Sequence, residues 1–285
     1  VDEVAFPIPV MTQDLLFDID RVEVLRGPQC TLYGRNTTDG DINFLTKKPT
    51  ADFHTGGTLE VGRFGHVVTE GYASGPISDT LLARFSIGME HGGGFQYNRV
   101  TGQGLGDADK VAARAKFDWK ASANLDVRLN LHAAYDHSES QGDYLFSPFP
   151  TNAYGIYPGP SPVLPADTDR FATGWGFSPA FAAQNGFSPN RKPGKHNNSA
   201  GADGYIDYDF GGVKLSSITS YEQLHRNEVG DWDSSQYAES DVFWGGDEKV
   251  FSQEVRLASN GDGPLHWVAG AYYSHQTQDE IYASD

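Results

Sequence analysis

Side chains that could carry out catalysis are dispersed along this sequence. It contains no Ser/His/Asp or Cys/His grouping and no paired carboxylates at a spacing typical of an active site. The glycine-rich run GQGLG at residues 102–106 lacks the lysine and the following helix of a nucleotide-binding loop. No two histidines stand at a metal-ligand spacing among His91, His132, His196, His225, His266 and His275. We therefore expect no enzyme, no dedicated metal site and no cofactor.

Aromatic side chains gather instead in a long segment, residues 139–200, which holds nine of the 15 prolines. Loops carry ligand contacts when a rigid scaffold presents them. Aromatic rings stack on planar ligands and attract cations. We expect five of these aromatics to border a ligand route: Tyr144, Phe146, Tyr154, Tyr157 and Trp175. The alternative for any one of them is packing within a loop that folds on itself and shields the scaffold.

The composition limits what that scaffold can be. The net charge of −17 comes without a basic stripe, which argues against a nucleic-acid partner. A single cysteine excludes an intrachain disulfide framework. No apolar run reaches about 18 residues, so a transmembrane helix is not expected. Membrane-spanning β-strands remain possible, because they need only about 9–11 residues and one apolar face.

Residues 51–285 alternate apolar and polar side chains with a period of two. The clearest stretch is 125–136, where Leu125, Val127 and Leu129 share one face and Asp126 and Arg128 share the other. The pattern predicts nine strands near residues 55–63, 66–75, 81–91, 111–121, 125–137, 202–211, 213–226, 248–259 and 265–277.

The connections between these strands alternate in length. Tight turns are expected at 75–80, 121–124, 211–212 and 260–264, and long loops at 92–110, 139–200 and 227–247. Short turns at one end and long loops at the other are typical of outer-membrane barrels. A secreted β-sandwich that binds carbohydrate would also alternate, but the dense charged face favours a polar lumen.

Residues 18–49 read DIDRVEVLRGPQCTLYGRNTTDGDINFLTKKP. The alternation at 21–25 and at 42–46 predicts two short strands, and Gly27-Pro28 is expected to end the first. This stretch resembles the closing half of the plug domain of TonB-dependent outer-membrane receptors. It departs from that pattern at Cys30 and Asp39, where glycine is usual, and at Asp41, where alanine is usual.

The resemblance implies a mainly β fold: part of a plug, residues 1–50, followed by about nine of the 22 strands of an antiparallel transmembrane barrel, residues 51–285. The chain is then expected to be a fragment of a longer receptor. In the family, plug arginines pair with barrel glutamates that face the lumen. We therefore expect anchoring by Arg26, Gly27, Pro28, Tyr33, Gly34, Arg35, Glu254 and Arg256, including an Arg26–Glu254 ion pair.

The resemblance also implies the activity. Receptors of this family import a scarce ligand, most often a ferric siderophore, across the bacterial outer membrane with energy from the TonB–ExbB–ExbD complex. Haem, cobalamin and a saccharide are the alternative ligands. A different class, a passive porin or a surface-binding barrel, would lack the plug motif. Outer-membrane lipid is the remaining expected partner.

Overall fold

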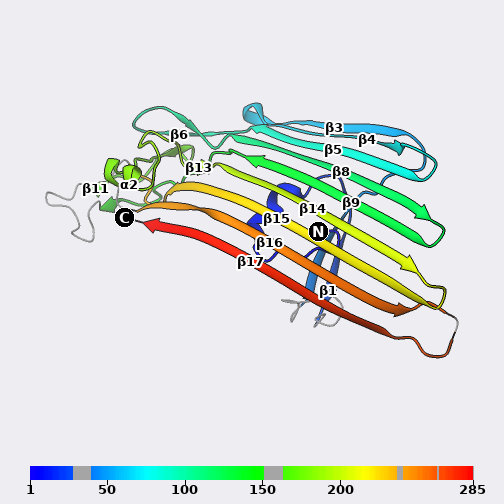
Figure 1. Cartoon of the computed structure of the whole chain (residues 1–285). Helices are drawn as coiled ribbons and strands as arrows, with labels where there is room; N and C mark the ends of the chain where they lie inside the picture. The colour runs from blue at the N-terminus through cyan, green and yellow to red at the C-terminus, as the bar shows by residue number, and fades with distance from the viewer. Residues whose placement is uncertain (28–39, 151–162, 236–239, 262, 285) are drawn as a thin grey trace.

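The computed structural model describes residues 1–27, 40–150, 163–235, 240–261 and 263–284. Its main feature is a curved antiparallel sheet in which nine long strands lie side by side in chain order (Figure 1). From one edge to the other they are β3 (His54–Val61), β4 (Val67–Pro76), β5 (Leu81–Gly92), β8 (Ala108–Ser122), β9 (Leu125–Asp136), β14 (Asn197–Asp209), β15 (Val213–Asp231), β16 (Asp241–Ser259) and β17 (Val268–Ser284). Each corresponds to a strand expected from the alternation, and the expected fold class is confirmed.

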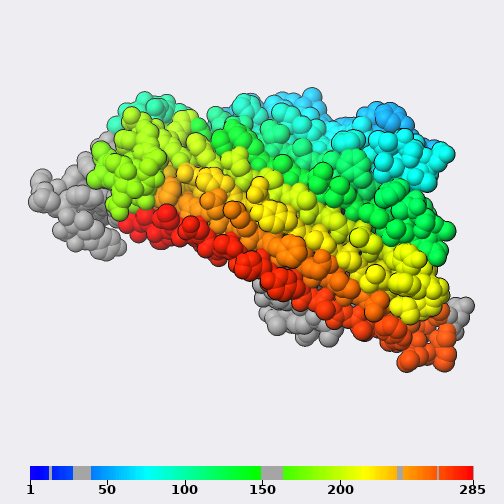
Figure 2. Space-filling view, in the orientation of Figure 1, coloured from blue at the N-terminus to red at the C-terminus, as the bar shows by residue number. Residues whose placement is uncertain are grey.

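The sheet turns apolar side chains outward and polar side chains inward. In β9, Leu129 and Leu131 are 39% and 40% exposed, whereas Asn130 and His132 are 4% and 7% exposed. In β5, Arg84 is buried beside an exposed Phe85. A soluble sandwich would bury its apolar face, so this inversion excludes the carbohydrate-binding sandwich and agrees with a lipid-facing barrel wall. The convex face of this wall is continuous from β3 to β17, and the N-terminal residues are hidden behind it (Figure 2).

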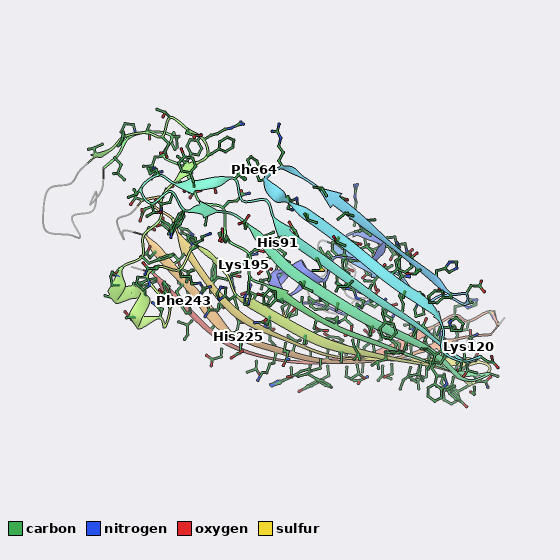
Figure 3. The ribbon with its side chains drawn as sticks, turned by 90° about the horizontal axis from the view of Figure 1, so that it is seen from above. Phe64, His91, Lys120, Lys195, His225 and Phe243 are labelled. Atoms are coloured by element: carbon green, nitrogen blue, oxygen red, sulfur yellow. The ribbon has the colours of Figure 1, made fainter. Side chains whose placement is uncertain are left out.

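Strand connections differ sharply between the two ends of the sheet. At one end the strands are joined at 77–80, 123–124, 210–212 and 260–267, and at the other at 62–66, 93–107, 137–196 and 232–240. The long connections crowd together around the short helix α2 (Pro179–Gln184), far from Lys120 at the tight-turn end (Figure 3). They also contain short strands: β6 (Gln96–Asn98), β7 (Gly104–Leu105), β10 (Phe149–Pro150), β11 (Val163–Leu164), β12 (Ala172–Thr173) and β13 (Gly194–Lys195). None of the helices in the described residues has the length and apolar character needed to cross a membrane.

A small unit occupies the concave side of the sheet, and we call it the plug. It consists of the first residues of the chain, a 3-10 helix, η1 (Pro9–Leu15), and an antiparallel hairpin of β1 (Ile19–Arg26) and β2 (Gly40–Thr46). Strand β1 ends where expected, because Gly27 adopts a φ of +87° and the following proline has no amide to donate.

The apolar core lies mainly between the plug and the wall. Leu15 and Phe17 pack with Ala112 and Ala134 of the wall. Two further clusters repeat the arrangement: Val4 with Tyr205 and Ile218, and Met11 with Leu224 and Val250. Burying one such large side chain contributes about 1.5–3 kcal/mol. The plug is therefore seated by its own hydrophobic contacts, and its polar contacts fix its position.

Candidate functional site

The strongest polar contact between plug and wall is a buried ion pair. Asp18 lies just before β1, and both of its carboxylate oxygens accept hydrogen bonds from Arg84 of β5, at 2.7 and 2.5 Å. The Arg84 and Asp18 side chains are only 4% and 7% exposed. The Arg84 guanidinium also lies 4.0 Å from the ring centre of Tyr72. Two parallel hydrogen bonds between charged groups fix orientation as well as distance.

A second cation from the wall holds the end of the 3-10 helix. Arg114 of β8 donates to the carbonyl oxygens of Leu15, at 2.7 Å, and Phe17, at 2.9 Å. Its guanidinium lies 4.5 Å from the centre of the Phe17 ring. The last carbonyls of a helix have no partner within the helix, so Arg114 satisfies them from outside.

The first residues of the chain make a third contact with the wall. Lys116 of β8 lies 2.8 Å from an Asp2 carboxylate oxygen, and Thr46 donates its amide and hydroxyl to the same carboxylate. Burial acts to raise the pKa of Asp2, but the Lys116 ammonium and the Thr46 hydrogen bonds outweigh it, so the pKa lies below its ordinary value. Tyr205 of β14 donates to the Asp2 carbonyl at 2.7 Å.

These contacts place cations on the wall and anions on the plug. The sequence reasoning expected the reverse for the predicted Arg26–Glu254 pair. Arg26 is exposed and takes part in no ion pair within the described residues. Glu254 does face the concave side, as expected, but it pairs with Arg256 at 2.8 Å, and Arg256 in turn pairs with Glu3 of the plug at 3.0 Å.

Several predicted anchoring positions cannot be placed. Pro28, Tyr33, Gly34 and Arg35 lie outside the described residues, as do Cys30 and Asp39. The part of the motif that is described, Arg26 and Gly27, ends strand β1. The anchoring residues that sequence reasoning missed are Asp2, Asp18, Arg84, Arg114 and Lys116. Alternation alone could have shown that the three wall cations share the inner face.

The long connections fold into a body at the other end of the sheet. Arg99 links its own connection, 93–107, to the other two, because it donates two hydrogen bonds to Asp167, at 2.7 and 2.6 Å, and one to the Ser234 carbonyl, at 2.7 Å. Beneath this network lies an apolar cluster that is buried throughout: Leu105, Trp175, Phe177, Phe181, Val229 and Phe243. The long connections therefore form a structured body over one end of the sheet.

The aromatics expected along a ligand route separate into two groups. Trp175 packs inside the loop cluster and is 7% exposed, so it stabilises the loops in this conformation. Tyr144 and Phe146 are accessible, at 48% and 83% exposed. Tyr154 and Tyr157 lie outside the described residues. Of the described members, only Tyr144 and Phe146 are free to stack on a ligand.

One group of side chains in the described residues is able to hold a metal ion. His132, Asp203 and Glu222 are all buried, and each offers a donor atom within 4.8 Å of the others. Sequence patterns do not reveal this group, because its members belong to three different strands, β9, β14 and β15. Only the register of those strands brings them together.

Comparison with known proteins identifies the fold. No protein-family profile matches the chain. It is 28% identical over 104 residues to the metal-pseudopaline receptor CntO of Pseudomonas aeruginosa (strain UCBPP-PA14), covering 36% of this chain and 14% of that protein. It is 41% identical over 73 residues to the pesticin receptor of Yersinia enterocolitica, covering 25% of this chain and 10% of that protein.

Similarity to solved structures extends over nearly the whole chain. The ferric yersiniabactin uptake receptor FyuA from Yersinia pestis superimposes with a TM-score of 0.68 and 19% identity, over 94% of this chain and 38% of that one. The chain thus spans little more than a third of a receptor of this kind. The predicted resemblance to TonB-dependent receptors is confirmed at the level of the fold.

Proposed function

We propose that this chain is the plug-bearing part of an outer-membrane receptor that imports a scarce ligand, a ferric siderophore, with energy from the TonB–ExbB–ExbD complex. The observation that carries the proposal is a plug fixed by buried ion pairs to the polar inner face of a sheet whose outer face is apolar. In this assignment residues 1–50 are plug and 51–285 are barrel wall.

The contacts that hold the plug against the wall favour energised import over passive diffusion through an open barrel. A passive barrel needs an open lumen, whereas here Asp18, Asp2 and η1 are held against the wall. A seat made of a few ion pairs and small apolar clusters can be released by a directed force without unfolding the sheet. Open pockets of about 680 and 370 Å³ lie between the plug and the tight-turn end of the wall.

The ligand would enter from the end that carries the long loops. Tyr144 and Phe146 are accessible aromatics of the 139–200 segment there, and rings of this kind stack on planar chelates. The solved receptors that resemble this chain include one for ferric yersiniabactin and one bound to ferripyoverdine. A ferric siderophore is therefore our first candidate, and haem, cobalamin or a saccharide would use the same route.

The test is growth of an iron-starved host that makes the protein from its own gene. Each ferric siderophore, haem and cobalamin is supplied in turn, with and without a functional TonB. We expect growth on one ligand and its loss when TonB is deleted. Uptake that persists without TonB would support a passive barrel instead. Growth on none of the metal ligands would shift the proposal to saccharide import.

Tyr144→Ala and Phe146→Ala then test the route. Loss of a stacking ring should raise the ligand concentration needed for half-maximal growth, by up to about tenfold for about 1.4 kcal/mol. Tyr221→Ala is the matched control, because Tyr221 is an exposed aromatic on the outer face of β15, away from the long connections.

A further inference from the structure

The cluster of His132, Asp203 and Glu222 is built by the register of three neighbouring strands. Gly201 of β14 lies directly opposite His132 on one side and Glu222 on the other. The imidazole and the carboxylate meet across β14, with His132 Nε2 2.8 Å from Glu222 Oε2. Asp203, two residues along β14 on the same inner face, lies 3.9 Å from His132 Nδ1.

Glycine at position 201 makes this meeting possible. A Cβ atom there would lie 2.1 Å from Glu222 Oε2 and 2.4 Å from His132 Nε2. Any other residue at this position would therefore hold the two side chains apart.

Neighbouring side chains orient the carboxylates. Asn130 donates to Asp203 Oδ2 at 2.9 Å, and Ser220 donates to Glu222 Oε1 at 3.4 Å. The second oxygen of Asp203, Oδ1, is buried and accepts no hydrogen bond from the part of the chain that the structure describes. The Asp203 and Glu222 side chains are 2% and 5% exposed, so water does not compensate their charge. Arg114 on the same inner face acts on Asp203 only at a distance, and among the described residues no Lys or Arg pairs directly with either carboxylate, so their burial is costly unless a cation joins them.

We propose that His132, Asp203 and Glu222 bind a divalent transition-metal ion, with Zn²⁺ as the representative member. One imidazole nitrogen with carboxylate oxygens is a donor set that zinc uses, whereas calcium prefers oxygen ligands alone. Neighbouring donor atoms in a tetrahedral zinc site lie about 3.4 Å apart, since each is about 2.0–2.2 Å from the metal. The donor atoms of the three side chains lie within 4.8 Å of one another, so these side chains must adjust their positions to coordinate one ion.

The position of the cluster suggests what the ion does. Tyr205, two residues after Asp203, donates to the carbonyl of Asp2, so the cluster lies in the wall beside the first residues of the plug. That part of the plug carries the carboxylates of Asp2 and Glu3. Without a cation the wall presents two more carboxylates to them. A bound dication turns this repulsion into attraction and helps to seat the plug.

The experiment measures Zn²⁺ binding to the protein purified in detergent from outer membranes of cells that carry its whole gene. After removal of metal by a chelator, Zn²⁺ alone is added and the bound ion is counted. We expect one equivalent per chain that excess Ca²⁺ does not displace. His132→Ala, Asp203→Asn and Glu222→Gln should each abolish it. Asn130→Ala, which removes only the orienting hydrogen bond, should weaken binding about 10–100-fold.

Glu248→Gln is the matched control, because Glu248 is a buried carboxylate of the same wall outside the cluster. It should retain the full equivalent. Gly201→Ala adds a second test, since it leaves all three donors in place but separates two of them, and it should also lose the ion. The folding of each variant is checked by electrophoresis of heated and unheated samples in detergent, because a folded protein resists unfolding in the unheated sample.

The proposal is overturned if the native protein binds no more Zn²⁺ than the Asp203→Asn variant, in which case the cluster is held by hydrogen bonds alone. It is also overturned if Glu248→Gln loses the ion, or if Ca²⁺ competes on equal terms. These outcomes do not depend on transport, so they are separate from the test of the proposed function.

Discussion

Asp18 and Arg84 bring two full charges out of water at the boundary between plug and wall. Removing one partner of such a pair leaves the other buried and uncompensated, which typically costs about 3–5 kcal/mol. Asp18→Asn and Arg84→Met should each loosen the plug. The expected result is increased sensitivity of the cells to bulky hydrophilic antibiotics, measured with the gene in its own context. The double variant should be less damaging than the sum of the two single changes, because it leaves no lone charge.

The control for this comparison is Arg226→Gln. The ion-pair partners of Arg226, Glu228 and Glu280, both belong to the wall, so its loss should leave the plug in place. Equal antibiotic sensitivity in Arg226→Gln and Arg84→Met cells would show that general weakening of the wall, and not release of the plug, causes the effect.

Asp2 provides a residue-scale prediction for pH. Its pKa in the folded protein lies below the ordinary value of 3.8, because the Lys116 ammonium and Thr46 outweigh burial. The stabilisation is therefore fully present above that ordinary value and is lost as the pH falls through the lower, folded pKa. Asp2→Asn should lower the thermal midpoint of the protein in detergent at neutral pH. The gap between variant and native protein should shrink in strong acid, and a gap independent of pH would contradict the assignment.

The residue scale also shows what the sequence could not reveal. Parity along β16 correctly placed Glu254 on the inner face, because side-chain direction is local information. The partner of each charge is not local, since Asp18 and Arg84 are 66 residues apart in the chain. Plug and wall both contain charges of each sign, so the sequence alone does not show which unit supplies the cations. The pairing of Arg26 with Glu254 followed the family pattern, whereas in this chain the wall supplies the cations and the plug the anions.

At the scale of elements, strand β5 has a glycine, Gly88, that leaves room for a side chain of the plug. Gly88 faces inward, and a Cβ atom there would lie 3.1 Å from the Cβ and Cγ atoms of Phe17. Gly88→Val should push Phe17 away from the wall and reproduce the permeability of the Arg84→Met cells. Gly204→Val is the matched control, because Gly204 of β14 has open space around it and the alternation of β14 turns it outward. Permeability that is unchanged in Gly88→Val would show that the plug does not depend on this contact.

The sequence predicted a strand wherever one of its faces is apolar and the other is polar, because the alternation of side chains is visible only there. All nine were expected, but β15, β16 and β17 extend further towards the loop end than the pattern indicated: to Asp231, from Asp241 and to Ser284. In these extensions polar residues and glycine occur on both faces, so the period of two is lost although the hydrogen bonds between strands continue. The His132 cluster was missed for a related reason, since it depends on the register across three strands.

At the scale of the whole molecule, the sheet has two open edges. Every residue of β3 and nearly every residue of β17 is exposed, and each strand pairs on one side only within the described residues. Unpaired backbone groups in lipid cost several kcal/mol each, and long unpaired edges in water invite association. The sheet therefore needs further strands to close a barrel, in keeping with the 38% of the FyuA structure that it covers.

This argument predicts the behaviour of residues 1–285 made alone. Refolded into detergent, they should give aggregates, with no monomer that resists unfolding in cold detergent, whereas the product of the whole gene should give such a monomer. The physical reason is that both products have the same apolar outer face, but only a closed barrel satisfies the edges of β3 and β17. Size-exclusion chromatography and electrophoresis of heated and unheated samples measure the difference. A soluble monomer of residues 1–285 that unfolds cooperatively would mean that the edges are satisfied within these residues, and the barrel assignment would then have to be replaced by a self-contained sheet.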